Sequence, residues 1–179
     1  MLEESVAGNT IDGEDGFDPG GGPEAKRRFR NALGQFATGV TAMTCLGPAG
    51  ERIGVTVNSF SSLSLDPPLI LWSLATGANS AASFKLGDPF AVNMLSVDQE
   101  AVALQFAKSA GDKFHGVALH TGLDGVPLVA GCVAYLECIT DARYPGGDHE
   151  IIVGRVRRIF NVGRRPLLFH AGAFQTLAS

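Results

Sequence analysis

Short apolar segments separated by turn residues run through most of this sequence, and they leave few folds open. Glycine, proline and aspartate stand between them, as at Gly47-Pro48-Ala49-Gly50. Only three short helices are expected, at 24–36, 81–86 and 98–107, and they do not alternate with strands as in βαβ units. The pattern predicts a mainly β protein, a closed β-barrel with helices at its sides. The expected strands are 40–46, 52–57, 69–74, 90–95, 133–142, 151–160 and 167–169.

The composition is that of a globular protein with a large buried core. Apolar residues make up 45% of the 179 residues and charged residues 18%. A net charge of −4 argues against a nucleic-acid-binding protein, which usually carries a basic face. No apolar run approaches the ~18 residues of a membrane span. We therefore expect a soluble protein with no nucleic-acid or membrane partner.

The first 22 residues differ from the rest of the chain. They contain six acids, six glycines and no lysine or arginine, and they end in the run Pro19-Gly20-Gly21-Gly22-Pro23. Taking these six acids from the total of 18 leaves 12 acids against 14 basic residues, so the remainder is +2. Such a segment buries too little apolar surface to offset its ordering entropy. The sequence predicts a disordered acidic tail at 1–22 and one domain at 23–179.

Cysteine and histidine usage indicates a reducing compartment and no metal. Cys45, Cys132 and Cys138 lie in apolar stretches, are odd in number and form no CxxC pair. Free buried thiols of this kind are ordinary in cytoplasmic proteins. The four histidines show no HExxH or Cys/His ligand spacing, so we expect no bound metal.

The most unusual stretch is the polar segment from Thr56 to Pro68. It places one threonine, one asparagine and four serines between two apolar strands. Short hydroxyl and amide groups suit binding of a phosphate or of the polar edge of a heterocycle. The alternative is a polar loop whose side chains cap backbone groups. A second cluster, Asn79-Ser80 with Ser83, permits the same two interpretations at the start of a helix.

Two further segments contain candidate functional side chains. In Tyr144–Glu150 the pair Gly146-Gly147 predicts a turn between strands, and His149 follows it. This histidine could donate a hydrogen bond or proton, or help to seat a second substrate; the alternative is a structural or solvated side chain. Asp112-Lys113-Phe114-His115 is a charged and aromatic cluster, or simply a solvated helix end.

The order of four segments resembles the short-chain NAD(P)H:flavin oxidoreductases, the reductases of two-component flavin monooxygenases. These segments are 29–41, 56–68, 112–114 and 147–149, and the resemblance extends from about Phe29 to Phe169. It implies a flavin-binding split β-barrel of Greek-key type with flanking short helices, working as a homodimer. It further implies FMN or FAD as flavin, NADH or NADPH as reductant, and transient delivery of reduced flavin to a partner monooxygenase.

The resemblance also assigns candidate site residues. The flavin would contact four consecutive residues, two serines, the backbone of one strand and a helix start. The nicotinamide nucleotide would contact an aromatic residue and the Gly-Asp-His triplet, whose histidine is the candidate catalytic residue. In order, these residues are Thr56, Val57, Asn58, Ser59, Ser61, Ser62, Trp72, Ser73, Leu74, Ser80, Ser83 and Phe84 for flavin, and Phe114, Gly147, Asp148 and His149 for the nicotinamide.

Hydride transfer agrees with the absence of a catalytic triad or carboxylate pair. It needs two flat rings held with their reacting atoms about 3–3.5 Å apart, with the cofactor supplying the redox chemistry. Two other functions stay open at this point. One is a non-catalytic flavin- or haem-binding barrel, and the other is an oxidase of a phosphorylated amine. The second needs basic phosphate-binding residues, and the stretch 56–64 contains none.

Overall fold

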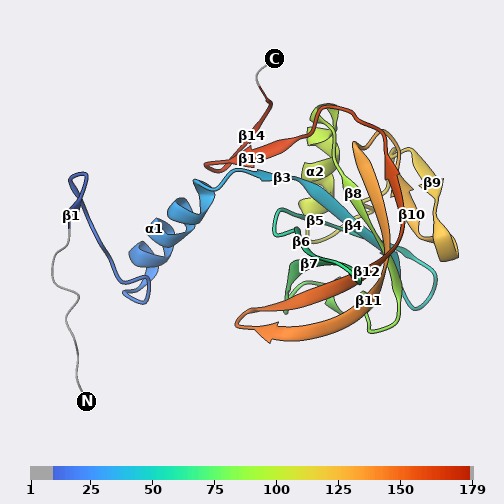
Figure 1. The fold of residues 1–179 in the computed structure, drawn as a ribbon, viewed down its shortest axis with the longest axis horizontal. Helices are drawn as coiled ribbons and strands as arrows, with labels where there is room; N and C mark the ends of the chain where they lie inside the picture. Colours follow the sequence, from blue (N-terminus) through green and yellow to red (C-terminus); the bar gives the residue numbers. More distant parts are fainter. Residues whose placement is uncertain (1–9, 178–179) are drawn as a thin grey trace. The chain divides into compact units, whose positions relative to one another are not determined.

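The computed structural model describes residues 10–177, which form two compact units (Figure 1). One unit comprises residues 10–37 with 170–173, and the other comprises residues 38–169 with 174–177. The expected acidic tail therefore lies partly outside the described residues, at 1–9. The unit boundary falls after residue 37, whereas the sequence places a domain boundary after residue 22.

The smaller unit contains helix α1, Pro23–Gly34, and a hairpin of two-residue strands, β1 (Thr10–Ile11) and β2 (Glu14–Asp15). Proline at the first helical position and Gly34 at the last explain where α1 begins and ends. The guanidinium of Arg28 lies 4.2 Å from the centre of the Phe17 ring and donates to the Asp15 carbonyl. Cation–π contact with the basic side of α1 thus gives the acidic segment 10–17 a defined position.

The larger unit is built on a seven-stranded antiparallel sheet in the order β5-β4-β8-β11-β12-β7-β6 (Figure 1). The two edge strands, β5 and β6, are consecutive in the chain, but no ladder joins them within residues 10–177. The barrel is therefore split along one seam, and the connection 58–60 crosses that seam. The strands are β4 Thr41–Leu46, β5 Arg52–Val57, β6 Ser61–Leu65, β7 Pro68–Ala75, β8 Pro89–Met94, β11 Ala134–Gly146 and β12 His149–Asn161.

Smaller elements cover the sheet. A three-stranded sheet has the order β14-β13-β3, and β9 pairs with β10. Among residues 10–177, no helix is long and apolar enough to span a bilayer. The remaining elements are β3 Thr38–Gly39, β9 Leu119–Thr121, β10 Pro127–Val129, β13 Leu168–His170, β14 Ala173–Gln175, α2 Glu100–Ala107 and the 3-10 helices η1 Ala81–Ser83, η2 Val97–Gln99 and η3 Leu123–Gly125.

Most expected elements are present, with two differences. The helix expected at 81–86 is only the single 3-10 turn η1, and Ser80 makes no side-chain cap there. The polar-loop interpretation of 56–68 is wrong for residues 61–65, which form β6 and pair with β7. Serines are poor strand formers, but β6 is an edge strand with four of its five residues exposed, where a polar sequence is tolerated.

Alternation along the central strands produces two buried clusters. In β8, Phe90 and Val92 face one cluster and Ala91 faces the other. The first cluster contains Trp72, whose ring centre lies 4.9 Å from that of Phe84. The second packs the sheet against α2. Strands β4 and β8 are thus covered on both faces, which makes the middle of the sheet the most buried part of the protein.

A polar network lies within this buried region. Asn93 is fully buried and its amide nitrogen donates to the Ala42 carbonyl (2.8 Å) and to Thr44 Oγ1 (2.9 Å). Its amide oxygen accepts the backbone N–H of Val129 at 2.7 Å, and Thr44 Oγ1 donates to the Pro127 carbonyl at 2.6 Å. Asn93 therefore ties β8 to both β4 and β10, and its polar atoms are matched.

Glu137 on β11 is a buried carboxylate with two fixed partners. Its side chain is 3% exposed, accepts a hydrogen bond from Arg158 on β12 and accepts the backbone N–H of Leu123. Burial alone would raise the pKa of Glu137, but the hydrogen bonds from Arg158 and Leu123 outweigh burial and lower this pKa below its ordinary value.

We predict that this pair stabilises the fold in a pH-dependent way. Because the pKa of Glu137 is lowered in the folded state, its stabilisation is complete above the ordinary carboxyl pKa of about 4.3 and is lost as the pH falls below it. Thermal unfolding of the wild type and of Glu137→Gln, measured between neutral and acidic pH, checks this. The difference in Tm should shrink as the pH falls, and a constant difference would contradict the prediction.

Candidate functional site

A pocket of about 260 Å³ lies at the seam of the barrel, and we call it the seam pocket. It is formed by the end of β5, the end of β7 and the first residue of β12. Five of its residues are small or apolar and five carry neutral hydrogen-bonding groups or the imidazole. They are Val55, Thr56, Val57, Asn58, Ser59, Ser73, Leu74, Ala75, Ala78 and His149.

Ser59 holds the two sides of the seam together. Its Oγ accepts the backbone N–H of Ser73 at 2.9 Å and donates to the Ser73 carbonyl at 3.2 Å. These two bonds join the connection 58–60 to β7. One side chain thus fixes the width of the seam pocket.

His149 reaches the seam pocket because a tight hairpin places it there. It is the first residue of β12 and pairs with Ala75 at the end of β7. Gly147, with φ of 72°, makes the turn, which a side chain would strain. The His149 Nδ1 lies 2.7 Å from a carboxylate oxygen of Asp148, and the Asp148 carbonyl accepts from both Thr76 N (3.0 Å) and Thr76 Oγ1 (3.1 Å). The Asp148 contact orients the imidazole and leaves Nε2 for a ligand.

The hydroxyl of Thr56 on β5 and the amide of Asn58, directly after β5, differ in the hydrogen bonds they can offer a ligand. Thr56 Oγ1 donates to the Ala103 carbonyl in α2 at 2.7 Å, so this hydroxyl can only accept from a ligand. The amide of Asn58 is exposed and has no hydrogen-bond partner among residues 10–177. Asn58 can therefore donate and accept at once, as the alternating edge of a heterocycle requires.

The structure brings together seven of the predicted site residues and separates the others. Ser61 and Ser62 lie on β6, with exposed side chains, outside the seam pocket. Gly147 and Asp148 belong to the turn before His149. The seven are Thr56, Val57, Asn58, Ser59, Ser73, Leu74 and His149.

The side chains around η1 face the core instead. Phe84 is 1% exposed and Trp72 is fully buried, so neither ring can touch a ligand in this conformation. Ser80 and Ser83 are also buried, and the Ser83 carbonyl lies 3.4 Å from the Cys45 sulfur. Trp72 is not among the residues that line the seam pocket.

Phe114 does not line the seam pocket either. Its side chain is buried and its ring centre lies 4.8 Å from that of Phe106. Both rings pack so closely against Gly54 of β5 that a Cβ there would come within 3.2 Å of them. Lys113 Nζ donates to the carbonyls of Gly54 (2.9 Å) and Phe106 (3.1 Å). The 112–114 segment thus packs against β5 and helps to fix its position.

Sequence reasoning missed Val55, Ala75 and Ala78, which form apolar walls of the seam pocket. Val55 can be predicted only from the two-residue period of a strand, which places it on the same face of β5 as Val57. The two alanines carry no chemical signal. The pairing of β7 with β12 reveals Ala75, and Ala78 follows in the turn, where its N–H donates to the Ala75 carbonyl at 3.0 Å.

The chemistry of the seam pocket suits a flat heterocycle such as the flavin ring. Its ten lining residues include no carboxylate and no lysine or arginine. At about 260 Å³ it falls just under the roughly 300–1,000 Å³ of typical small-molecule sites. The volume accommodates a ring system, and the rest of a nucleotide would extend beyond it.

None of the three cysteines in the described part of the chain is an activated nucleophile. Burial raises the pKa of the Cys45, Cys132 and Cys138 thiols to about 12, so all three stay protonated. Within residues 10–177, no three His, Cys, Asp or Glu side chains gather as a metal site requires. What the site offers is neutral hydrogen bonding, apolar walls and one oriented imidazole.

The split barrel and its seam pocket are features that suit a protein that binds a flat heterocycle. The model of the flavin reductase like domain matches residues 33–178, most of the chain. The chain belongs to this family.

Named relatives agree with this membership. The FMN reductase (NADH) SmoA of Agrobacterium fabrum is 45% identical over 158 residues, 88% of each chain. The reductase subunit HsaB of a flavin-dependent monooxygenase from Rhodococcus jostii is 36% identical, over 83% of this chain and 76% of the relative. The NADH:FAD oxidoreductase SgcE6 of Streptomyces globisporus, solved with NAD and FAD fragments, superimposes with a TM-score of 0.82 at 38% identity, covering 90% and 95%.

Some relatives are longer than this protein. The chain spans 49% of one curated relative that is 41% identical and 54% of one solved chain at the same identity. Activities of those longer proteins need not reside in the matched half.

Proposed function

We propose that this protein is an NAD(P)H-dependent flavin oxidoreductase that binds the ring of FMN or FAD in the seam pocket. The observation that carries the proposal is the seam pocket itself, whose lining combines hydroxyl and amide groups with apolar side chains and His149. The reductase names of the relatives at 36–45% identity support it. When bound, flavin supplies the redox chemistry by accepting a hydride from the nicotinamide.

The protein's own residues orient the rings. Asn58 is placed to bond the polar edge of the flavin, while Thr56 Oγ1 accepts and the apolar side chains of Val55, Val57 and Leu74 exclude water. Neutral donors stabilise charge that develops on the ring without a fixed cation. Micromolar binding corresponds to roughly −8 kcal/mol, which a few hydrogen bonds and ring burial can supply. A flavin held this weakly can leave after reduction.

His149 is the proposed contact for the nicotinamide nucleotide. Its imidazole lines the seam pocket together with residues of β5 and is oriented by Asp148. A nicotinamide ring placed between this imidazole and the flavin would contact the flavin ring. We assign His149 to seating the second substrate, with Gly147 and Asp148 shaping the turn that holds it.

We further propose a homodimer, a transient monooxygenase partner and a cytoplasmic setting. The monooxygenase partner is supported by the relative HsaB, a reductase subunit of a monooxygenase. The cytoplasmic setting is supported by three free, buried cysteines. The exposed apolar side chains of α1, among them Phe29 and Leu33, support a covering partner chain.

Oxidation of NADH or NADPH by the purified protein with added FMN, FAD or riboflavin tests the reductase proposal. Loss of nicotinamide absorbance that depends on flavin is expected. Tight stoichiometric flavin binding without turnover would instead support a non-catalytic flavin-binding barrel. No response to any flavin with either nicotinamide would overturn the proposal.

The change His149→Ala is expected to raise the KM for the nicotinamide nucleotide about tenfold or more while flavin affinity changes less than about threefold. Loss of one hydrogen bond and of imidazole packing is worth about 1–2 kcal/mol. Steady-state kinetics and a flavin titration on the same samples check this. His115→Ala, in the exposed loop after α2, is the matched control and should change neither. Equal losses of both affinities would show that His149 does not act on the second substrate alone.

A further inference from the structure

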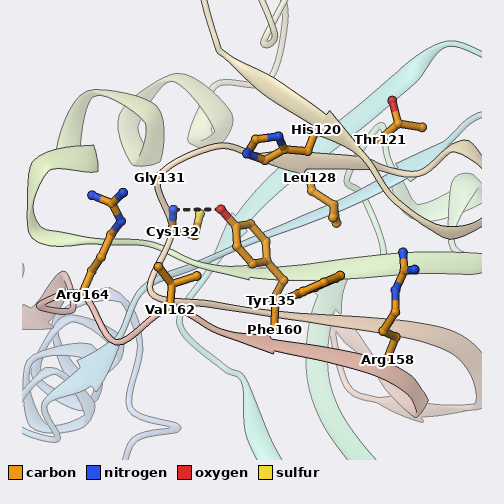
Figure 2. Close-up of a pocket in the computed structure, with 10 residues that line it drawn as sticks. All are labelled: His120, Thr121, Leu128, Gly131, Cys132, Tyr135, Arg158, Phe160, Val162 and Arg164. Atoms are coloured by element: carbon orange, nitrogen blue, oxygen red, sulfur yellow. Dashed lines mark hydrogen bonds between the residues drawn. The ribbon is translucent and has the colours of Figure 1, made fainter.

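A second hollow, larger than the seam pocket, lies elsewhere on the main unit. Its volume is about 390 Å³, and it is bounded by β9, β10, β11 and the far end of β12 (Figure 2). None of its ten lining residues belongs to the seam pocket. We call it the β9–β12 pocket.

The interior of the β9–β12 pocket is aromatic and aliphatic. Leu128 and Tyr135 are 5% and 6% exposed and form its buried side. Phe160 meets Tyr135 edge-on, with ring centres 6.3 Å apart, although Phe160 itself is 42% exposed. Figure 2 shows the Tyr135 ring between His120 and Phe160, with its hydroxyl oxygen accepting the backbone N–H of Cys132 at 3.1 Å. An exposed phenylalanine beside a fixed tyrosine offers a ready surface for another flat ring.

The rim of the β9–β12 pocket is cationic. Arg158 bonds Glu137 through Nε, and its guanidinium lies 5.0 Å from the centre of the Phe160 ring. Arg164 has no hydrogen bond or ion pair among residues 10–177, and in Figure 2 it extends on the opposite side of Tyr135 from Arg158. His120 also lines the pocket. None of the ten lining residues is acidic, so the pocket favours a negative ligand.

We propose that the β9–β12 pocket binds a small aromatic carboxylate. The ring would pack against Tyr135 and Phe160, and the carboxylate would accept hydrogen bonds from Arg164, whose planar fork matches two oxygens. A volume of about 390 Å³ is near the lower end of small-molecule sites, so one or two rings fit. The site is separate from the proposed redox pocket, and its occupation does not require flavin.

Calorimetric titration of the flavin-free protein with benzoate and 2-naphthoate tests the proposal. Saturable binding is expected, and Arg164→Gln should weaken it about tenfold or more, because a charge-assisted hydrogen bond is lost. Val162→Trp should abolish binding by filling the hollow. Arg157→Gln is the matched control, since Arg157 lies on β12 next to Arg158 but lines a different hollow, and it should leave binding unchanged.

Further probes separate the alternatives. Benzyl alcohol keeps the ring but lacks the charge, and acetate keeps the charge but lacks the ring. Each should bind at least about tenfold more weakly than benzoate. Absence of saturable benzoate binding, equal binding by wild type, Arg164→Gln and Val162→Trp, or displacement by FMN would overturn the proposal. So would a change in oligomeric state on gel filtration of Val162→Trp, which would make the hollow an interface between copies. Thermal unfolding of each variant confirms that it is folded.

Discussion

Replacing Asn58 with leucine is expected to weaken flavin binding by roughly five- to 150-fold. Leucine has nearly the shape of asparagine but offers no hydrogen bond, so a buried donor or acceptor of the flavin would lose its partner at a cost of about 1–3 kcal/mol. The amide of Asn58 has no partner among the described residues, so its removal costs the apo fold little. Loss of affinity can therefore be assigned to the ligand.

Quenching of flavin fluorescence during titration measures this effect. Asn161→Leu, an exposed asparagine at the other end of β12, is the matched control and should bind flavin as the wild type does. An Asn58→Leu protein with unchanged flavin affinity would remove this residue from the site. It would leave the β9–β12 pocket untouched, so the two proposals fail separately.

The change Asn93→Leu should lower the free energy of unfolding by about 3–5 kcal/mol. Three hydrogen bonds are lost, and the Val129 N–H and the Ala42 carbonyl become less well paired in a fully buried place. Urea unfolding measures the loss. Because Asn93 joins β8 to β4 and β10, the damage should spread through the middle of the sheet.

A second buried polar residue provides the control. Thr140 is 1% exposed, and its hydroxyl has no hydrogen-bond partner among the described residues. Thr140→Val, which replaces this hydroxyl with a methyl group, should therefore be neutral or stabilising by up to about 1 kcal/mol. If Thr140→Val destabilised as much as Asn93→Leu, the loss in Asn93→Leu could not be assigned to its hydrogen bonds.

The seam pocket shows why a reductase can work without charged catalytic residues. Ser59 is hydrogen-bonded to Ser73 of β7, and the Thr56 hydroxyl is oriented by its hydrogen bond to α2. The 112–114 segment holds β5 through the hydrogen bond from Lys113 to the Gly54 carbonyl. Each of these contacts fixes geometry and none supplies a strong acid or base. For hydride transfer, position is the main contribution a protein can make.

Particular elements show which parts of the fold can be predicted from the sequence. The strand at 52–57 and the hairpin at Gly146-Gly147 follow from local patterns, because alternation and turn chemistry act over a few residues. The edge strand at 61–65 does not, since its serines are acceptable only on an edge that pairing creates. Phe114 likewise gives no local sign that it faces a core.

The residues around the seam pocket are the clearest case. Asn58 and His149 stand 91 positions apart, and each is a visible candidate by its chemistry. That they line the same hollow depends on the pairing of β7 with β12 and on the Ser59 contact with Ser73. Such long-range pairing depends on the packing of the whole sheet, which no short stretch encodes.

The sequence by itself determined the class of fold and the strands and helices that have a clear hydrophobic period. It also determined which functional groups are available to bind a ligand. Tertiary structure alone decided which of those groups share a pocket, which are consumed in the core, and that a cationic aromatic hollow exists at the other end of β12. The physical reason is range: propensity and turn geometry act between neighbours, whereas burial and strand register are settled by contacts between residues far apart in the chain.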